Sequence, residues 1–280
     1  MEDRRRNKNE DGNAGGVAAL ITPMPKYSQV FLADKGICAR IAGALSGAAF
    51  DNLLEIGPGG GALTQFLFPQ YGGCMKAVEI DGALVPGLRE RFKGLEIINK
   101  DFLQLDLALA AGPGRTAFIG NLPYDCSTPI LDKTLLFSGF ALGVFMFQKE
   151  VARRLTAVPG DHDYGYLTLI TSARAEARLF MDIKAGSFKP VPAVDSSVLI
   201  LRPRLFFSVP GREEAFRKLL KKAFMHRRKT LINSLALAGL DKAAAAAAVA
   251  RAGLKPTVRA QEISLPVFAQ LAEFLQPEII

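Results

Sequence analysis

A chain of 280 residues that is 49% hydrophobic, with a mean hydropathy of +0.18, can bury one large core and a smaller second one, which excludes a natively disordered protein. No apolar run approaches the roughly 18 residues that are needed to span a bilayer. The net charge of +8 matches the excess of ten basic over two acidic residues between Arg202 and Lys229, so one segment is strongly basic and the rest is neutral in sum.

The first 25 residues mix four basic with four acidic side chains and have no apolar core of a secretory signal, so we expect a mobile, solvated arm there. The three cysteines, Cys38, Cys74 and Cys126, lie far apart in the sequence. This spacing predicts no disulfide framework and suits the reducing cytoplasm, where we expect the protein to act. The two histidines, His162 and His226, have no partner at ligand spacing, so we expect no metal site.

From about residue 26 to residue 208, helical patterns alternate with short apolar runs, which predicts βαβ units and a mainly parallel sheet. The expected fold is an α/β, Rossmann-like sheet with helices on both faces. Strands are expected at 52–56, 74–80, 95–99, 115–120 and 140–147, and helices at 33–45, 62–68, 83–92, 128–137 and 150–155. A helix over 164–177 and strands over 176–183 and 194–204 follow, and these strands can form an antiparallel edge.

After Pro210 and Gly211 the pattern becomes helical throughout, which predicts a small second domain over residues 209–280. Its helices are expected at 213–225, 230–239, 241–253 and 265–275. The tract of six alanines in the third of these has maximal helix propensity, so we interpret it as a tightly packed helix.

The stretch LLEIGPGGGALT places Gly57, Gly59 and Gly61 between a strand and a helix. Such a turn lets the backbone approach a ligand closely and points helix N-terminal amides toward it. The same letters fit the dinucleotide pattern G-x-G-x-x-[GA], with Ala62 in the last place, so a nicotinamide or flavin fold remains an alternative. Glu79, after the next strand, can bind a ribose in either case.

Two later strand ends favour S-adenosylmethionine over a dinucleotide. Asp101 and Phe102 offer a carboxylate for an exocyclic amine and an apolar ring beside an adenine, the alternative for Asp101 being a helix cap or turn residue. The stretch GNLPYDCSTP then presents the Asn121 amide, the Leu122 carbonyl and the Tyr124 ring at the mouth of the sheet. Two acceptors on the N–H groups of an adenine stabilise charge that develops at N6, and an aromatic ring stacks on an extruded base.

The alternative for this stretch is ordinary turn chemistry, in which Pro123 only stops the strand. In order along the chain, the motifs resemble the KsgA-type family of small-subunit ribosomal RNA adenine dimethyltransferases, which are class I methyltransferases. The matching stretches are SQVFLAD, LLEIGPGGGALT, AVEID, KDFLQLD, NLPYDCSTPI, MFQKEVARRL, YGYLT, FKPVPAVDSSV, AFMHRRKTLINSL and RAQEISL. The glycine turn is a generic motif, whereas NLPY is specific to amino-group methylation. The presence of all these stretches in the same order is highly specific.

The resemblance implies roles for individual residues. The cofactor site is expected to comprise Gln29, Val30, Leu32, Gly57, Gly59, Glu79, Ile80, Asp101, Phe102 and Asn121. The target adenine is expected to lie against Asn121, Leu122, Pro123 and Tyr124, with Phe188 closing over its other face. From the basic segment we expect RNA contacts by Arg217, Lys221, Lys222, Arg227, Arg228 and Lys229, a solvated helix face being the alternative.

The implied reaction dimethylates N6 of two adjacent adenines in the 3′-terminal hairpin loop of the small-subunit RNA, with S-adenosylmethionine as the methyl donor. We expect a monomer that acts on this RNA in the pre-30S particle and does not bind a membrane. The alternatives are a large-subunit RNA methyltransferase of the antibiotic-resistance type and a non-catalytic assembly or transcription factor on the same fold. The sequence departs from the family at Ser28, Val30 and Asp125, where Gly, Asn or His, and Asn are usual.

Overall fold

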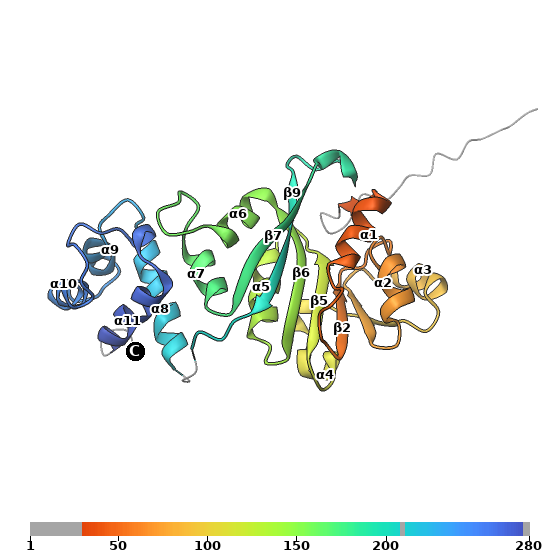
Figure 1. The fold of residues 1–280 in the computed structure, drawn as a ribbon, viewed down its shortest axis with the longest axis horizontal. Helices are drawn as coiled ribbons and strands as arrows, with labels where there is room; N and C mark the ends of the chain where they lie inside the picture. The colour runs from red at the N-terminus through yellow and green to blue at the C-terminus, as the bar shows by residue number, and fades with distance from the viewer. Residues whose placement is uncertain (1–29, 208–210, 277–280) are drawn as a thin grey trace, which may run out of the picture.

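The computed structural model describes residues 30–207 and 211–276 (Figure 1). The predicted arm at residues 1–25, and with it Gln29 of the predicted cofactor site, lies outside the described residues. A twisted sheet with helices on both faces occupies one side of the molecule, and a group of helices lies at the other end (Figure 1).

The sheet has seven strands. They are β2 (Asn52–Ile56), β3 (Met75–Glu79), β4 (Glu96–Asn99), β5 (Thr116–Asn121), β6 (Phe140–Gln148), β7 (Ala175–Ile183) and β9 (Ser196–Pro203). Their order is β4-β3-β2-β5-β6-β9-β7, parallel from β4 to β6 and antiparallel where β9 joins β6 and β7. A separate antiparallel pair joins β1 (Phe31–Leu32) to β8 (Phe188–Lys189). The predicted Rossmann-like α/β sheet with an antiparallel edge is therefore confirmed.

Both faces of the sheet are buried because side chains alternate along each strand. On β2, Leu53 packs with residues of α1 (Lys35–Gly43), α2 (Thr64–Tyr71) and α3 (Val85–Arg91). Its neighbour Leu54 packs on the opposite face, which is covered by α4 (Leu107–Ala111), α5 (Ser127–Leu136) and α6 (Lys149–Thr156). The connections between the parallel strands consequently bring the strand ends that carry Gly57, Glu79 and Asn121 to one edge of the sheet.

The predicted helix over 164–177 is wrong at its end. Helix α7 (Tyr166–Ser172) stops before Ala175, where β7 begins. Ala175 and Ala177 favour a helix by propensity, but they pair with Pro203 and Leu201 of β9. This pairing outweighs the local preference, which is weak compared with tertiary contacts.

The C-terminal helices are α8 (Arg212–Phe224), α9 (Leu231–Leu237), α10 (Lys242–Arg251) and α11 (Leu265–Phe274). Their core contains Phe216 and Phe268, and it also takes in Tyr164 and Leu169 from the segment that includes α7. The hydrophobic core of this region therefore extends beyond the boundary expected near residue 209.

Salt bridges join these helices to the sheet-bearing part. The Glu213 carboxylate of α8 pairs with Arg174, and Arg217 of α8 lies 2.9 Å from Asp132 of α5 and 3.0 Å from Glu213. The side chains of Arg217 and Glu213 are only 19% and 16% exposed, so these pairs are screened less by solvent than surface pairs. Within the described residues, no helix is long and apolar enough to cross a membrane, and no group of three or more potential ligands could hold a metal ion.

Gly120, the first residue of the GNLPY stretch, lies where β5 crowds against β2. A Cβ atom added at Gly120 would meet the Ile56 carbonyl oxygen at 2.5 Å, and backbone cannot move aside as a flexible side chain can. We expect Gly120→Ala to lower the free energy of unfolding by about 1–3 kcal/mol, measured by urea denaturation. Gly87→Ala is the control, because Gly87 lies in α3 with nothing within 4 Å of its added Cβ, and alanine there should stabilise by about 0.5–1 kcal/mol. Equal effects of the two substitutions would show that strand packing at Gly120 is not the constraint.

Candidate active site

An open cleft lies at the carboxyl edge of the parallel strands. It encloses about 760 Å³ when its open mouth is included. Ten of the predicted cofactor and adenine residues line it: Val30, Leu32, Gly57, Gly59, Glu79, Ile80, Asn121, Leu122, Pro123 and Tyr124. The structure therefore brings together residues that are up to 94 positions apart in the sequence.

The glycine turn forms the floor of the cleft. Gly57 and Gly59 have φ angles of 67° and 56°, in the left-handed region that favours glycine. A Cβ added at Gly59 would lie 2.8 Å from Cε1 of Phe31, whereas one added at Gly57 would meet nothing within 4 Å. Gly57 thus leaves the backbone open to a ligand, and Gly59 lets the Phe31 ring pack against the turn.

Glu79 closes the cleft at the end of β3 with a side chain that is 2% exposed. Its Oε2 atom accepts the Gly59 N–H at 2.9 Å, and its Oε1 atom accepts the Asp81 N–H at 2.9 Å. Burial raises the pKa of this carboxyl above its usual value, and the two backbone donors oppose that rise. Each carboxylate oxygen keeps a lone pair, so the group can still accept hydrogen bonds from a pair of hydroxyls.

A second carboxyl, that of Glu55 on β2, also lines the cleft and is 1% exposed. The Thr64 hydroxyl donates to its Oε2 atom at 2.7 Å. Burial raises the pKa of Glu55 to about 7, an effect that the Thr64 hydrogen bond lessens and the charge of Glu79 increases. An apolar cleft with two buried carboxyls and an open glycine turn fits the ribose and the amino groups of a nucleoside cofactor.

The Asn121 side chain is fixed by a contact to the segment before β1. Its Nδ2 atom donates to the Val30 carbonyl at 2.8 Å, across 91 residues of sequence. Because the nitrogen is engaged there, the Oδ1 atom is the part of the amide that remains to accept a hydrogen bond from a ligand. Val30 lacks the polar side chain that is usual in the family, but its backbone still serves the site.

The residues after Asn121 form the rim of the cleft. Leu122 directs its side chain into the core, with 1% exposure, while Pro123 and Tyr124 are half-buried. The Tyr124 hydroxyl lies 3.0 Å from the Ser196 hydroxyl at the start of β9. The aromatic ring therefore spans from the cleft wall to the sheet.

Three predicted residues do not line the cleft. Asp101 caps a short 3₁₀ turn, its Oδ1 atom accepting the Leu103 N–H at 2.8 Å, which is the capping role considered as the alternative. Phe102 is 4% exposed in the core beside Leu54, and Phe188 is fully buried beside Leu32 in the two-stranded pair. Both rings are packed in the core, and the ligand contacts of all three residues stay predictions.

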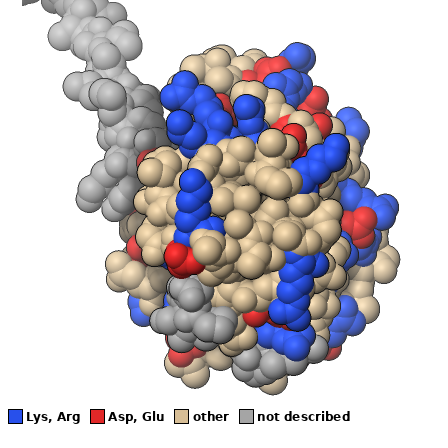
Figure 2. All heavy atoms as spheres, turned by 90° about the vertical axis from the view of Figure 1, so that its left-hand side faces the viewer, with Lys and Arg blue, Asp and Glu red and all other residues tan. Residues whose placement is uncertain are grey.

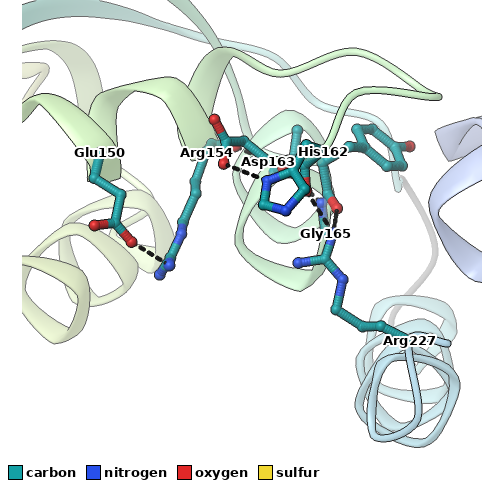
Figure 3. Close-up of polar contacts among 8 residues, drawn as sticks. Glu150, Arg154, His162, Asp163, Gly165 and Arg227 are labelled. Atoms are coloured by element: carbon teal, nitrogen blue, oxygen red, sulfur yellow. Dashed lines mark hydrogen bonds and ion pairs between the residues drawn. The ribbon is translucent and has the colours of Figure 1, made fainter.

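The basic segment divides into two groups. Arg217 is held by Glu213 and Asp132, Lys222 donates to the Ala238 carbonyl at 2.8 Å, and Arg227 donates to the His162 and Tyr164 carbonyls at 2.7 and 2.8 Å. Figure 3 shows the Arg227 guanidinium reaching from α8's end to the loop before α7. Among the described residues, the exposed side chains of Lys221, Arg228 and Lys229 make no hydrogen bond or ion pair. On the end of the helical region, Lys and Arg gather in separate groups around an uncharged centre (Figure 2).

Five cleft residues are missing from the sites predicted from the sequence, namely Phe31, Glu55, Pro58, Ala62 and Leu63, and two of them bear on its chemistry and packing. Glu55 is the only charged residue of the strand NLLEI, and an ionisable side chain in a buried strand is itself a signal of a site. Phe31 lies between two residues that were predicted, Val30 and Leu32, but its contact with Gly59 depends on the tertiary structure.

Comparisons with known proteins agree with this geometry. The model of the family described as ribosomal RNA adenine dimethylase matches residues 23–277. The ribosomal RNA small subunit methyltransferase A of Geobacter metallireducens is 42% identical over 260 residues, covering 87% of this chain and 92% of the relative. That of Methylococcus capsulatus is 38% identical over 263 residues, covering 91% and 98%.

Solved structures show the same fold. The 23S rRNA methyltransferase ErmE superposes with a TM-score of 0.67 at 28% identity, over 88% of this chain and 99% of that chain. A dimethyladenosine transferase from Plasmodium falciparum has a TM-score of 0.75 at 23% identity, over 89% and 98%. The likeness to both extends through the sheet and into the helical region.

The raised pKa of Glu55 predicts a pH dependence of stability. Its carboxyl keeps a proton up to about pH 7 in the folded protein but loses it near pH 4.5 when unfolded, so the folded state binds more protons between these values. The free energy of unfolding should therefore fall as pH rises from 4.5 to 7, and Glu55→Gln should remove up to about 3 kcal/mol of that fall. Urea denaturation from pH 4.5 to 8 measures it, with Glu90→Gln, an exposed carboxylate on α3, as the control. Parallel curves for wild type and Glu55→Gln would contradict the assignment.

Proposed function

This chain belongs to the ribosomal RNA adenine dimethylase family, and on that premise we propose that it transfers methyl groups from S-adenosylmethionine to N6 of adenines in small-subunit ribosomal RNA. The proposed targets are two adjacent adenines in the 3′-terminal hairpin loop, each of which receives two methyl groups. The observation that carries the proposal is the Asn121 amide, held by the Val30 carbonyl at 2.8 Å in the cleft that the glycine turn and Glu79 line.

S-adenosylmethionine, when bound, supplies an activated methyl group on a sulfonium. We propose that Gly57 and Gly59 let the backbone approach this cofactor and that the Glu79 carboxylate accepts its ribose hydroxyls. Ile80 is 41% exposed at the cleft, which makes it the apolar surface on which we place the cofactor's adenine. We keep Asp101 and Phe102 as proposed contacts of that base, with the Asp101 carboxylate accepting a hydrogen bond from its exocyclic amine.

The residues of the turn act on the target adenine. N6 is a poor nucleophile because its lone pair is delocalised into the ring. Acceptance of its N–H groups by Asn121 Oδ1 and the Leu122 carbonyl favours the pyramidal nitrogen and stabilises the positive charge that develops during transfer. Pro123 restricts the turn that presents this carbonyl, and Tyr124 provides a ring for stacking.

Two other functions were considered from the sequence. ErmE, a 23S rRNA methyltransferase, shares the fold at 28% identity, while the two small-subunit relatives are 38% and 42% identical. The assembled cleft with a polar rim also favours an enzyme over a non-catalytic binder. We further propose that the chain acts on the pre-30S particle in the cytoplasm, because that particle carries the proposed RNA substrate. We propose that it does so as a monomer.

The direct test is mass spectrometry of RNA after incubation with protein and S-adenosylmethionine, using unmodified small-subunit particles and, separately, large-subunit RNA. We expect dimethyladenosine only in the small-subunit RNA, at two adjacent positions. Single-turnover methylation should fall about 10²- to 10³-fold in Asn121→Ala and about 5- to 150-fold in Tyr124→Ala.

The control for Asn121 is Asn52, whose Nδ2 atom donates to the Pro113 carbonyl at 2.7 Å, at the end of β2 away from the cleft. Asn52→Ala removes the same kind of hydrogen bond and should keep full methylation per folded molecule. Loss of methylation in both asparagine variants would indicate a general folding defect, and full activity of Asn121→Ala would overturn the proposed role of its amide.

The basic segment gives a second prediction. Arg228→Ala should weaken RNA binding and lower the slope of log K against log salt by about 1, with little effect on stability. Arg227→Ala should instead lower the melting temperature, because it removes two hydrogen bonds that hold the loop before α7. Filter binding at several salt concentrations and thermal unfolding measure the two effects. The assignment fails if Arg228→Ala leaves the salt slope unchanged.

A further inference from the structure

The Tyr124 ring has an anchor at its far end. Tyr124 follows β5 in a turn and is half-buried, so the turn backbone alone leaves more than one χ1 rotamer, and hence more than one ring position, open to it. The hydrogen bond to the Ser196 hydroxyl at 3.0 Å holds the far end of the ring, and it therefore restricts rotation about χ1, which would move the hydroxyl away. Stacking depends on where the ring lies relative to the base, so this bond bears on the proposed role of Tyr124.

Ser196 is a rigid anchor. It is the first residue of β9, it is fully buried, and it pairs with Gln148 of β6 on one side and Ile183 of β7 on the other. The preceding residue is also held, because the Asp195 carbonyl accepts the Lys149 N–H at 3.0 Å. The position of the Ser196 hydroxyl is therefore set by three strands rather than by a loop.

The next serine provides a natural contrast. Ser197 is 1% exposed, and its hydroxyl donates to Asp182 Oδ1 on β7 at 2.6 Å. Successive side chains of a strand point to opposite faces of the sheet, so only Ser196 is directed toward the turn. The two serines are equally buried and both hydrogen-bonded, but one reaches a residue of the cleft and the other does not.

We propose that Ser196 is a positioning residue of the methyl-transfer site, which holds the Tyr124 hydroxyl and so fixes the position of the ring on which the target adenine stacks. The inference rests on the proposed function, because it needs an adenine at the rim of the cleft. Ser196 touches neither substrate nor cofactor and acts only through Tyr124. A purely structural serine would hold the start of β9 without affecting how a base binds.

A double-mutant cycle with Ser196→Ala and Tyr124→Phe tests the proposal on the full chain. Each change removes one partner of the same hydrogen bond and leaves the phenyl ring in place. One neutral hydrogen bond corresponds to about a 2- to 12-fold loss, so kcat/KM for the RNA should fall by that factor in each single variant. The double variant should lose no more than either single one, because the two residues act through one bond.

A second readout reports the stacking itself. RNA that carries 2-aminopurine at the target position fluoresces less when the base stacks on an aromatic ring, and this analogue lacks the N6 amine, so no reaction intervenes. We expect wild type and the control Ser197→Ala to quench it equally, and Ser196→Ala and Tyr124→Phe to quench it less. The affinity for S-adenosylmethionine, measured by calorimetry, should be unchanged in Ser196→Ala, because Ser196 does not line the cleft.

The outcomes distinguish a failure of the proposed function from a failure of the proposed role of Ser196. Failure of the wild-type protein to methylate small-subunit RNA would overturn the proposed function. Methylation by wild type, with Ser196→Ala and Ser197→Ala alike in kcat/KM and in quenching, would overturn only the role of Ser196. Independent, multiplying losses in the cycle would also overturn it, because the serine would then act by a route other than Tyr124.

Discussion

The hydrogen bond from Asn121 Nδ2 to the Val30 carbonyl joins the end of β5 to the segment that leads into β1. It decides which end of the amide faces the cleft, and it brings Phe31 and Leu32 over the glycine turn, where Phe31 packs against Gly59. Gly59 in turn donates its N–H to Glu79. A chain of contacts thus runs from the amide to the carboxylate through the Val30 carbonyl, the Phe31 ring and the Gly59 backbone.

The cleft contains two buried carboxyl groups, whose desolvation is unfavourable but which can bind a ligand. Glu55 and Glu79 are both nearly inaccessible and lie on neighbouring strands, and burial raises the pKa of each. Hydrogen bonds from Thr64 and from two backbone amides offset part of the desolvation. Two carboxyls in this environment favour a ligand that brings hydrogen-bond donors or a positive charge.

The helical region uses its positive charge in two ways. Arg217 and Arg227 make contacts with α5 and with the loop before α7, so they orient these helices relative to the sheet. Lys221, Arg228 and Lys229 remain exposed beside them. One segment therefore contains both the charged side chains that hold the helices in place and the exposed basic group that makes the nearby surface positive.

The sequence by itself determined the order of strands and helices, the glycine turn and most of the cleft residues, because hydrophobic periodicity and turn residues act locally and the resemblance covered the whole ordered set of motifs. Other features were decided only by the tertiary structure. Pairing of β7 with β9 begins at Ala175, so α7 is shorter than the helix predicted from the sequence. Packing in the core buries Phe102 and Phe188. Arg217 and Arg227 contact residues that are distant in sequence, and Ser196 hydrogen-bonds to Tyr124 in the same way. Such contacts depend on distances between segments that no local pattern encodes. Charge alone therefore could not distinguish Arg227, which hydrogen-bonds to another segment, from its neighbour Arg228.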